Sequence, residues 1–140
     1  MSKGEIAQRQ RDVHYAFRRS NLVVLSGTSW TEIVPPIPEG RHGLLHYLFY
    51  TNESGSASAA TVTARLVAPR FGAGFTMGLG RRTCNSGLGS PIHNNRPFTA
   101  PFGLENEGHR EVLEVGDSVE VQLSIVDASH YVLACWIEYT

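Results

Sequence analysis

The sequence predicts a single all-β domain, an antiparallel β-sandwich of jelly-roll type. Its 140 residues and 41% hydrophobic content are enough for one core. Several short stretches alternate apolar and polar side chains with the two-residue period of a strand. Clusters of Gly, Pro, Asn, Asp and Ser separate these stretches at the spacing typical of sandwiches and barrels.

The first half of the chain contains strand candidates of two kinds. Short apolar runs cover residues 22–25 and 30–34, and a rigid proline-rich connector follows over residues 35–40. Residues 42–51 form a longer candidate with two largely apolar faces, which predicts a central strand or a subunit contact. Residues 61–67 alternate cleanly after a polar turn, so we expect the two strands around this turn to form a hairpin.

Glycine and proline punctuate residues 70–104, and we expect most of this segment to be a long loop. Short strands are expected within it only near residues 71–77 and 97–102. Loops of this length in compact domains usually have a function. We therefore expect this loop to bind a partner or bridge subunits, with an unoccupied surface loop as the alternative.

The C-terminal third has the clearest strand pattern. Strands are expected over residues 111–115, 118–125 and 131–139, with turns between them. Such a succession is typical of an antiparallel meander with one buried face. Cys135 lies inside the last strand and is expected to be a small core residue.

Residues 1–20 form a separate basic segment ahead of the sandwich domain at 21–140. Apolar residues recur in it at helical spacing, so both a short amphipathic helix and an arm that orders on a partner fit. The chain after residue 105 is acidic, and the two ends could pair between neighbouring copies, with two solvated faces as the alternative. No signal peptide or bilayer-length apolar stretch is present, so we expect a soluble protein made in the cytoplasm.

No motif for catalysis or cofactor binding stands out. His42 and His46 would lie about 13 Å apart on one strand, too far to share a metal ion. The glycines of residues 72–78 lack the preceding strand and following helix of a phosphate-binding loop. No base is placed beside Cys84 by a recognisable motif. The sequence therefore predicts no enzyme, no metal and no cofactor.

The composition favours protein partners. A formal net charge of -1 gives no reason to expect nucleic acid or a membrane as a partner. Arginine and aromatic side chains are favoured where proteins meet. The candidate partner contacts lie in the basic segment and in the long loop: Tyr15, Phe17, Arg18, Arg19, Arg81 and Arg82.

Part of the chain resembles small structural proteins of tailed bacteriophages. In those proteins a strand leads into a proline-glycine turn, a long strand ends in an Asn-Thr/Ser-Gly turn, and a Thr-Val-Thr strand returns. The resemblance rests on residues 28–34, 36–40, 44–56, 60–66 and 114–121. The Gly-Asp turn and terminal strand are also similar to trimeric jelly rolls of the tumour necrosis factor and complement type.

The resemblance implies a virion protein, either a head decoration (cement) protein or a tail or fibre component. Decoration proteins of this kind commonly sit as trimers over capsid junctions and reach neighbours with terminal arms. We therefore expect a homotrimer that binds the major capsid protein and stabilises the phage head. A tail or fibre module that binds a receptor or glycan is the alternative, marked by aromatic side chains at one loop end. A cupin-type enzyme would need a clustered His/Glu metal set, which the sequence lacks.

Overall fold

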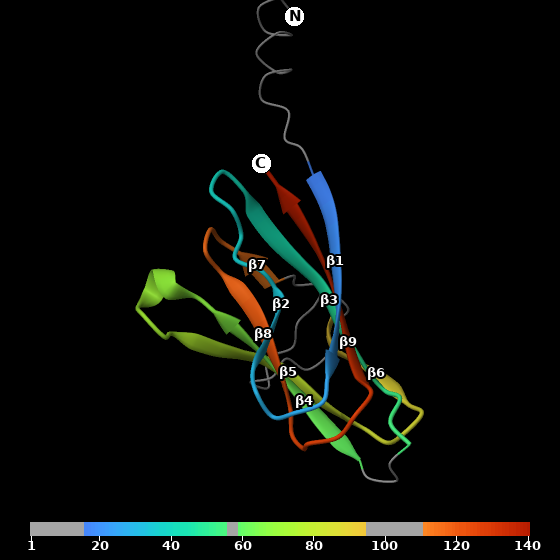
Figure 1. Cartoon of the computed structure of the whole chain (residues 1–140). Helices are drawn as coiled ribbons and strands as arrows, with labels where there is room; N and C mark the ends of the chain where they lie inside the picture. The colour runs from blue at the N-terminus through green and yellow to red at the C-terminus, as the bar shows by residue number, and fades with distance from the viewer. Residues whose placement is uncertain (1–15, 56–58, 95–110) are drawn as a thin grey trace, which may run out of the picture.

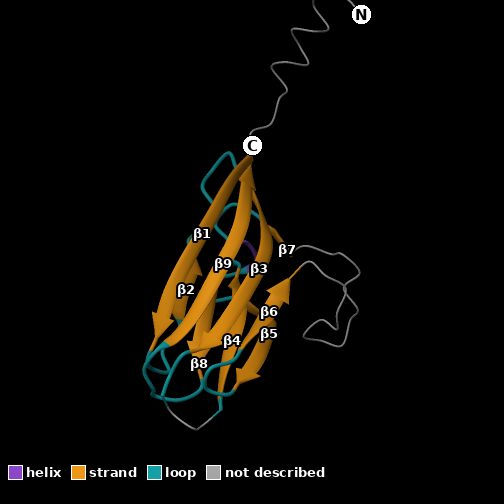
Figure 2. Cartoon of the chain, turned by 90° about the vertical axis from the view of Figure 1, so that its right-hand side faces the viewer, coloured by secondary structure: helices purple, strands orange, loops and turns teal. Residues whose placement is uncertain are grey.

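Two antiparallel sheets pack face to face in the computed structural model, which describes residues 16–55, 59–94 and 111–140 (Figures 1 and 2). The five-stranded sheet has the order β1 (Ala16–Leu25), β9 (His130–Tyr139), β3 (His42–Asn52) and β6 (Gly89–Asn94), with β7 (Glu111–Leu113) also paired to β3. The four-stranded sheet has the order β2 (Thr31–Val34), β8 (Ser118–Leu123), β4 (Ala60–Val67) and β5 (Thr76–Cys84). The predicted all-β sandwich is confirmed.

The core lies between the sheets and is filled by alternate residues of each strand. Val62, Ala64 and Leu66 of β4 point inward and are buried, as are Val119 and its alternating neighbours in β8. This period-two pattern is the one the sequence shows, because successive side chains of a strand point to opposite faces.

A bulge in β3 changes which of its residues face the core. The register against β9 shifts between Leu45 and Tyr47, so that His46 is the extra residue. An extra residue reverses the alternation beyond it. As a result Leu45 and Leu48 both point inward although their positions differ by an odd number, and both are fully buried.

Two predicted strand connections are wrong. The turn after β3 leads to β4 in the other sheet, so these strands form no hairpin. The C-terminal strands form no meander either, because β8 pairs with β2 and β4 while β7 and β9 both pair with β3. The physical reason is that the alternation of apolar and polar residues identifies which side chains face the core. This alternation is the same in either sheet, so it does not predict which strands pair.

Residues 70–104 contain more strand than predicted. β5 pairs with β4 from Thr76 to Cys84, and β6 pairs with β3. Glycines at 78, 80 and 89 obscure the alternation in the sequence, yet Leu79, Cys84 and Ile92 reach the core. The strand expected at 97–102 lies outside the described residues.

The predicted boundary of the N-terminal segment is also displaced. Residues 16–20 belong to β1 and pair with β9, beginning with Ala16 opposite Tyr139. These residues are polar or exposed because β1 lies at the edge of the sheet, which is why their sequence resembles an arm. The helix or arm expected for residues 1–15 lies outside the described residues.

We expect Leu48→Ala to lower the free energy of unfolding by about 2–5 kcal/mol, because it opens a cavity at a fully buried site. Urea unfolding followed by tryptophan fluorescence measures the change. Val126→Ala is the control, since Val126 is 82% exposed, and it should change the free energy by less than about 0.5 kcal/mol. Equal effects of the two substitutions would contradict this assignment of the core.

Candidate functional site

The outward face of the five-stranded sheet is largely apolar, with Arg18, Ser20, His42 and Thr51 among its polar members. Leu22 and Val24 of β1, Leu133 of β9 and Phe49 of β3 all lie on it, because residues directly opposite one another share a face. Leu22 and Val24 are 56% and 57% exposed. We call this surface the outer apolar face; its residues are Leu22, Val24, Leu44, Tyr47, Phe49, Val112, Tyr131, Leu133, Cys135, Ile137 and Tyr139.

The outward face of the four-stranded sheet is polar. Thr61 and Thr63 of β4 lie on it, and the hydroxyl of Thr61 is 2.6 Å from that of Thr83 on β5. Arg65 donates to Glu120 at 2.9 Å, and its guanidinium lies 3.8 Å from the centre of the Trp30 ring. Solvent normally faces such a surface. Of the two sheets, only the five-stranded one therefore has a largely apolar outward face.

A shallow hollow of about 340 Å³ lies on the outer apolar face beside the β3 bulge. Arg18 and Ser20 of β1 line it together with His46, Tyr47 and Cys135. The Nδ1 atom of His46 is buried there without a hydrogen-bond partner in the described structure. A hydrogen bond with Cys135 and burial raise the pKa of Tyr47, which keeps its phenol protonated.

A polar cluster fixes the N-terminal half of β1 to the sheet. Glu138 of β9 accepts hydrogen bonds from Nε1 of Trp136 and Nη1 of Arg41, each at 2.9 Å. Arg19 of β1 adds an ion pair at 3.7 Å, and the Arg41 guanidinium lies 4.4 Å from the centre of the Phe17 ring. Burial raises the pKa of Glu138, but these hydrogen bonds and charges outweigh it, and the net pKa lies below its ordinary value.

Three of the predicted contact residues lie in β1. Phe17 and Arg19 belong to the Glu138 cluster, so their side chains already have partners within the chain. Arg18 faces outward and lines the hollow. Tyr15 lies outside the described residues.

The other two predicted contact residues lie in β5, in the other sheet. Arg81 is exposed, and Arg82 donates from Nη1 to the Arg81 carbonyl oxygen at 2.8 Å. The five described residues therefore lie on two different sheets, at two separate candidate contacts.

Sequence reasoning missed most of the outer apolar face. The signal was present in residues 42–51 and 131–139, where both faces of each strand are largely apolar. Cys135 was expected in the core, but it is half-buried on the outer face. It lies outside because its neighbours Ala134 and Trp136 take the inward positions.

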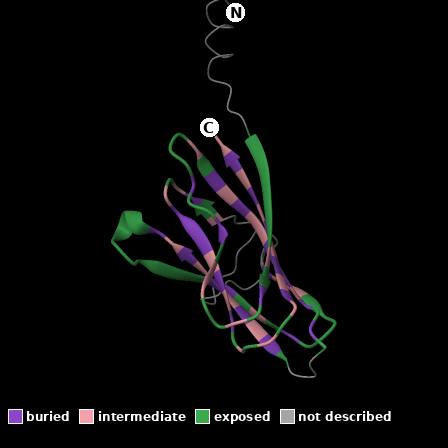
Figure 3. Ribbon diagram, viewed as in Figure 1, coloured by how far each residue is buried: buried purple, intermediate pink, exposed green. Residues whose placement is uncertain are grey.

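An exposed aromatic pair at the tip of the β4–β5 hairpin was also missed. Phe71, in the short helix η1 (Pro69–Phe71), and Phe75 pack edge to face, with ring centres 5.3 Å apart. They are 60% and 40% exposed at the projecting tip, drawn in green in Figure 3. Gly72 and Gly74 adopt positive φ, which allows the tight turn between the two phenylalanines.

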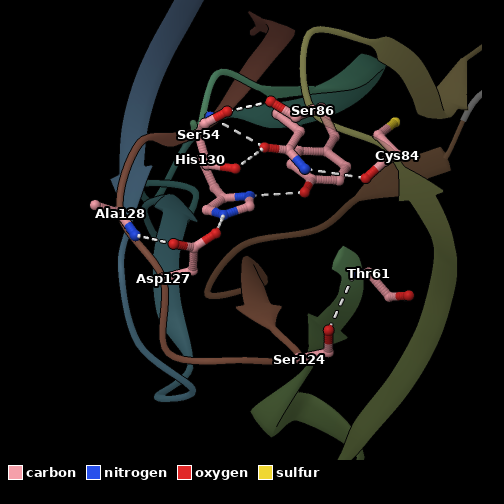
Figure 4. Close-up of polar contacts among 10 residues, drawn as sticks. Ser54, Thr61, Cys84, Ser86, Ser124, Asp127, Ala128 and His130 are labelled. Atoms are coloured by element: carbon pink, nitrogen blue, oxygen red, sulfur yellow. Dashed lines mark hydrogen bonds and ion pairs between the residues drawn. The ribbon is translucent and has the colours of Figure 1, made fainter. Parts of the chain in front are cut away.

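A buried polar chain links β3 to the start of β9 (Figure 4). The hydroxyl of Tyr50 lies 2.8 Å from Nδ1 of His130, and Nε2 of His130 lies 3.0 Å from Oδ2 of Asp127. Burial raises the pKa of Tyr50 to about 12. Because the Asp127 carboxylate only accepts, Nε2–H of His130 donates to it, and the Tyr50 hydroxyl donates to Nδ1 of the ring. The hydrogen bond from His130 lowers the pKa of Asp127.

Neither a metal centre nor a membrane span is found in the described parts of the chain. Among residues 16–55, 59–94 and 111–140, no group of three or more His, Cys, Asp and Glu side chains is placed to hold a metal ion. No helix within these ranges is long and apolar enough to cross a membrane.

No protein-family model and no curated protein matches the sequence. Similar solved structures include a disulfide-linked pilus of the Bacillus endospore appendage, with 9% identity, a TM-score of 0.46 and coverage of 91% of this chain and 88% of that one. The VP2 subviral particle of infectious bursal disease virus has 10% identity, a TM-score of 0.41 and coverage of 91% and 33%. The C-terminal family 22 carbohydrate-binding module of Clostridium thermocellum Xyn10B has 10% identity, a TM-score of 0.39 and coverage of 89% and 83%. All three TM-scores lie below 0.5, and none of the three is a phage decoration protein.

We expect Glu138→Gln to destabilise the fold by about 1–3 kcal/mol at neutral pH, because Arg41 loses a charged acceptor. The lowered pKa of Glu138 stabilises the fold above the unfolded pKa, and this stability is lost as pH falls through the folded pKa. Urea unfolding between pH 7 and pH 3 should therefore show a shallower acid loss in the variant. Exposed Glu39→Gln is the control, and parallel curves for Glu138→Gln and the native chain would contradict the assignment.

We expect Tyr50→Phe to lower the free energy of unfolding by about 1–3 kcal/mol, since Nδ1 of His130 is left buried without its donor. Tyr131→Phe removes the same atom from a half-buried position on the outer apolar face and serves as the matched control. Thermal unfolding measures both. An unchanged midpoint in Tyr50→Phe would show that the buried chain does not stabilise the fold.

Proposed function

We propose that the chain is a virion structural protein, a head decoration protein that stabilises the phage head by bridging capsid subunits. The observation that supports this most directly is the outer apolar face. Contiguous apolar patches of this kind on a soluble domain commonly mark a contact with another protein. The phage resemblance in residues 28–34, 36–40, 44–56, 60–66 and 114–121 supports a virion as the place of that contact.

The shape of the face suits attachment to a broad protein surface. Its residues come from four hydrogen-bonded strands, β1, β9, β3 and β7, and the pairing of β3 with β9 is interrupted only by the bulge at His46. A sheet face is preorganised, so its side chains lose little freedom on binding. Phe49 and Tyr47 supply the aromatic anchors that dominate protein interfaces, and Arg18 supplies a cation at the hollow.

The alternative, a tail or fibre module that binds a receptor or glycan, has weaker support. Its expected mark is exposed aromatic side chains at one loop end. Trp136 is 5% exposed and the Trp30 ring is covered by Arg65, so neither indole is an exposed aromatic of this kind. The exposed pair Phe71 and Phe75 is the one feature that favours it. A glycan array tests this alternative directly.

We expect the double substitution Phe49→Asp with Leu133→Asp to weaken binding to heads prepared without the chain by at least about tenfold. Two charges would then have to be buried in an apolar contact. Co-sedimentation of the purified chain with such heads measures the affinity. Thr63→Asp with Thr83→Asp places the same charges on the polar face of the other sheet and should bind like the native chain.

Circular dichroism and urea unfolding establish that both double variants are folded. Native affinity in the Phe49/Leu133 variant would contradict docking through the outer apolar face. Failure of the native chain to bind these heads would contradict the decoration function itself.

A further inference from the structure

β1 is the edge strand of the five-stranded sheet, and we propose that it pairs antiparallel with β1 of a second copy across a two-fold axis. β9 occupies one side of β1, and no described strand pairs with the other side. An unpaired strand edge presents a row of backbone donors and acceptors to any strand that can align with it. Figure 3 shows β1 exposed over nearly all of its length.

The edge lacks two of the features that commonly block such pairing, a proline and a bulge. The strand from Ala16 to Leu25 contains no proline and no glycine, and it pairs with β9 without a register shift. Bulges, prolines and charges are the usual protections of an edge. The last six residues, Ser20–Leu25, carry no charge, and Leu22 and Val24 are their most exposed apolar side chains.

The distribution of charge along β1 favours a second copy in the antiparallel direction. Both arginines of the strand, Arg18 and Arg19, lie in its first half. An antiparallel pair centred near Ser20–Leu22 places them beside the uncharged half of the other copy, whereas a parallel in-register pair would align like charges. Arg19 is also paired with Glu138 in its own chain, which offsets one of the two charges.

The contact is continuous with the outer apolar face. Leu22 and Val24 lie at the border of that face, so the pairing would join the outer apolar faces of two copies into one surface. A two-fold contact of this kind gives a dimer, whereas the phage resemblance implies a homotrimer. The proposal does not depend on docking to a capsid, and its test can fail independently of the proposed function.

The register can be tested by single cysteines introduced along the strand. Ser20, Asn21, Leu22 and Val23 are each replaced by Cys, one at a time, in a Cys135→Ser background, because Cys135 lies opposite Ser20 in the same chain. Across a two-fold axis, only the residue on the axis lies opposite the same residue of the other copy. The two copies of a residue two positions from the axis are separated by about 13 Å along the strands, too far for a disulfide. Mild oxidation should give a covalent dimer for one position and little for its distant neighbours.

Thr63→Cys in the same background is the control, since Thr63 lies on the polar face of the other sheet. Dimer yields no greater than this control at every β1 position would overturn the proposal.

A second measurement separates strand pairing from docking through the face. Light scattering of the native chain should give the mass of a dimer, and Leu22→Lys should shift it to a monomer because two like charges then meet near the axis. The Phe49→Asp with Leu133→Asp variant keeps β1 intact and should remain a dimer while losing head binding. A native monomer, or a trimer unaffected by Leu22→Lys, would overturn the β1 pairing and leave the docking proposal in place.

Discussion

The inward position of two polar residues on β9 decides which face of the five-stranded sheet is left outside. His130 at its start is held by Tyr50 and Asp127, and Glu138 near its end is held by Arg41 and Trp136. Because the side-chain period of a strand is two, a slip of one residue would turn every inward side chain of β9 outward. Such a slip would bury a more apolar set, but it would separate His130 from Tyr50 and Glu138 from Arg41. The polar ends thus specify the register, and the outer apolar face is its consequence.

How far the sequence predicts this structure depends on which property is considered. Alternation predicts the strands around residues 61–67, 118–125 and 131–139, because every second side chain of a strand points toward the core. It could not assign β3, β4 and β8 to their sheets, because an inward residue has the same character in either sheet. It also failed where glycine replaces side chains, as in β5, and where an extra residue such as His46 reverses the alternation.

The candidate site was predicted even less completely than the fold. Residues 42–51 correctly suggested a strand with two apolar faces, but Cys135 was expected in the core. No spacing rule predicts that His130 meets Tyr50 eighty positions away, and these long-range contacts decide which face of β9 turns inward. The aromatic and cationic side chains of the candidate arm residues Phe17 and Arg19 suit a contact with Glu138 and Arg41 of the same chain as well as a contact with a partner.

The two proposed contacts meet on β1, and this makes them cooperative. Leu22 and Val24 belong both to the free edge and to the outer apolar face, so pairing of two edges would place the two faces side by side. A partner surface that spans both copies would then bind two faces held at a fixed distance, and the second contact would form at a high effective concentration. Weak attachment through one flat sheet face would thereby become strong attachment through two. The Glu138 cluster supports this arrangement, because its ion pair with Arg19 helps to hold the first half of β1 against β9.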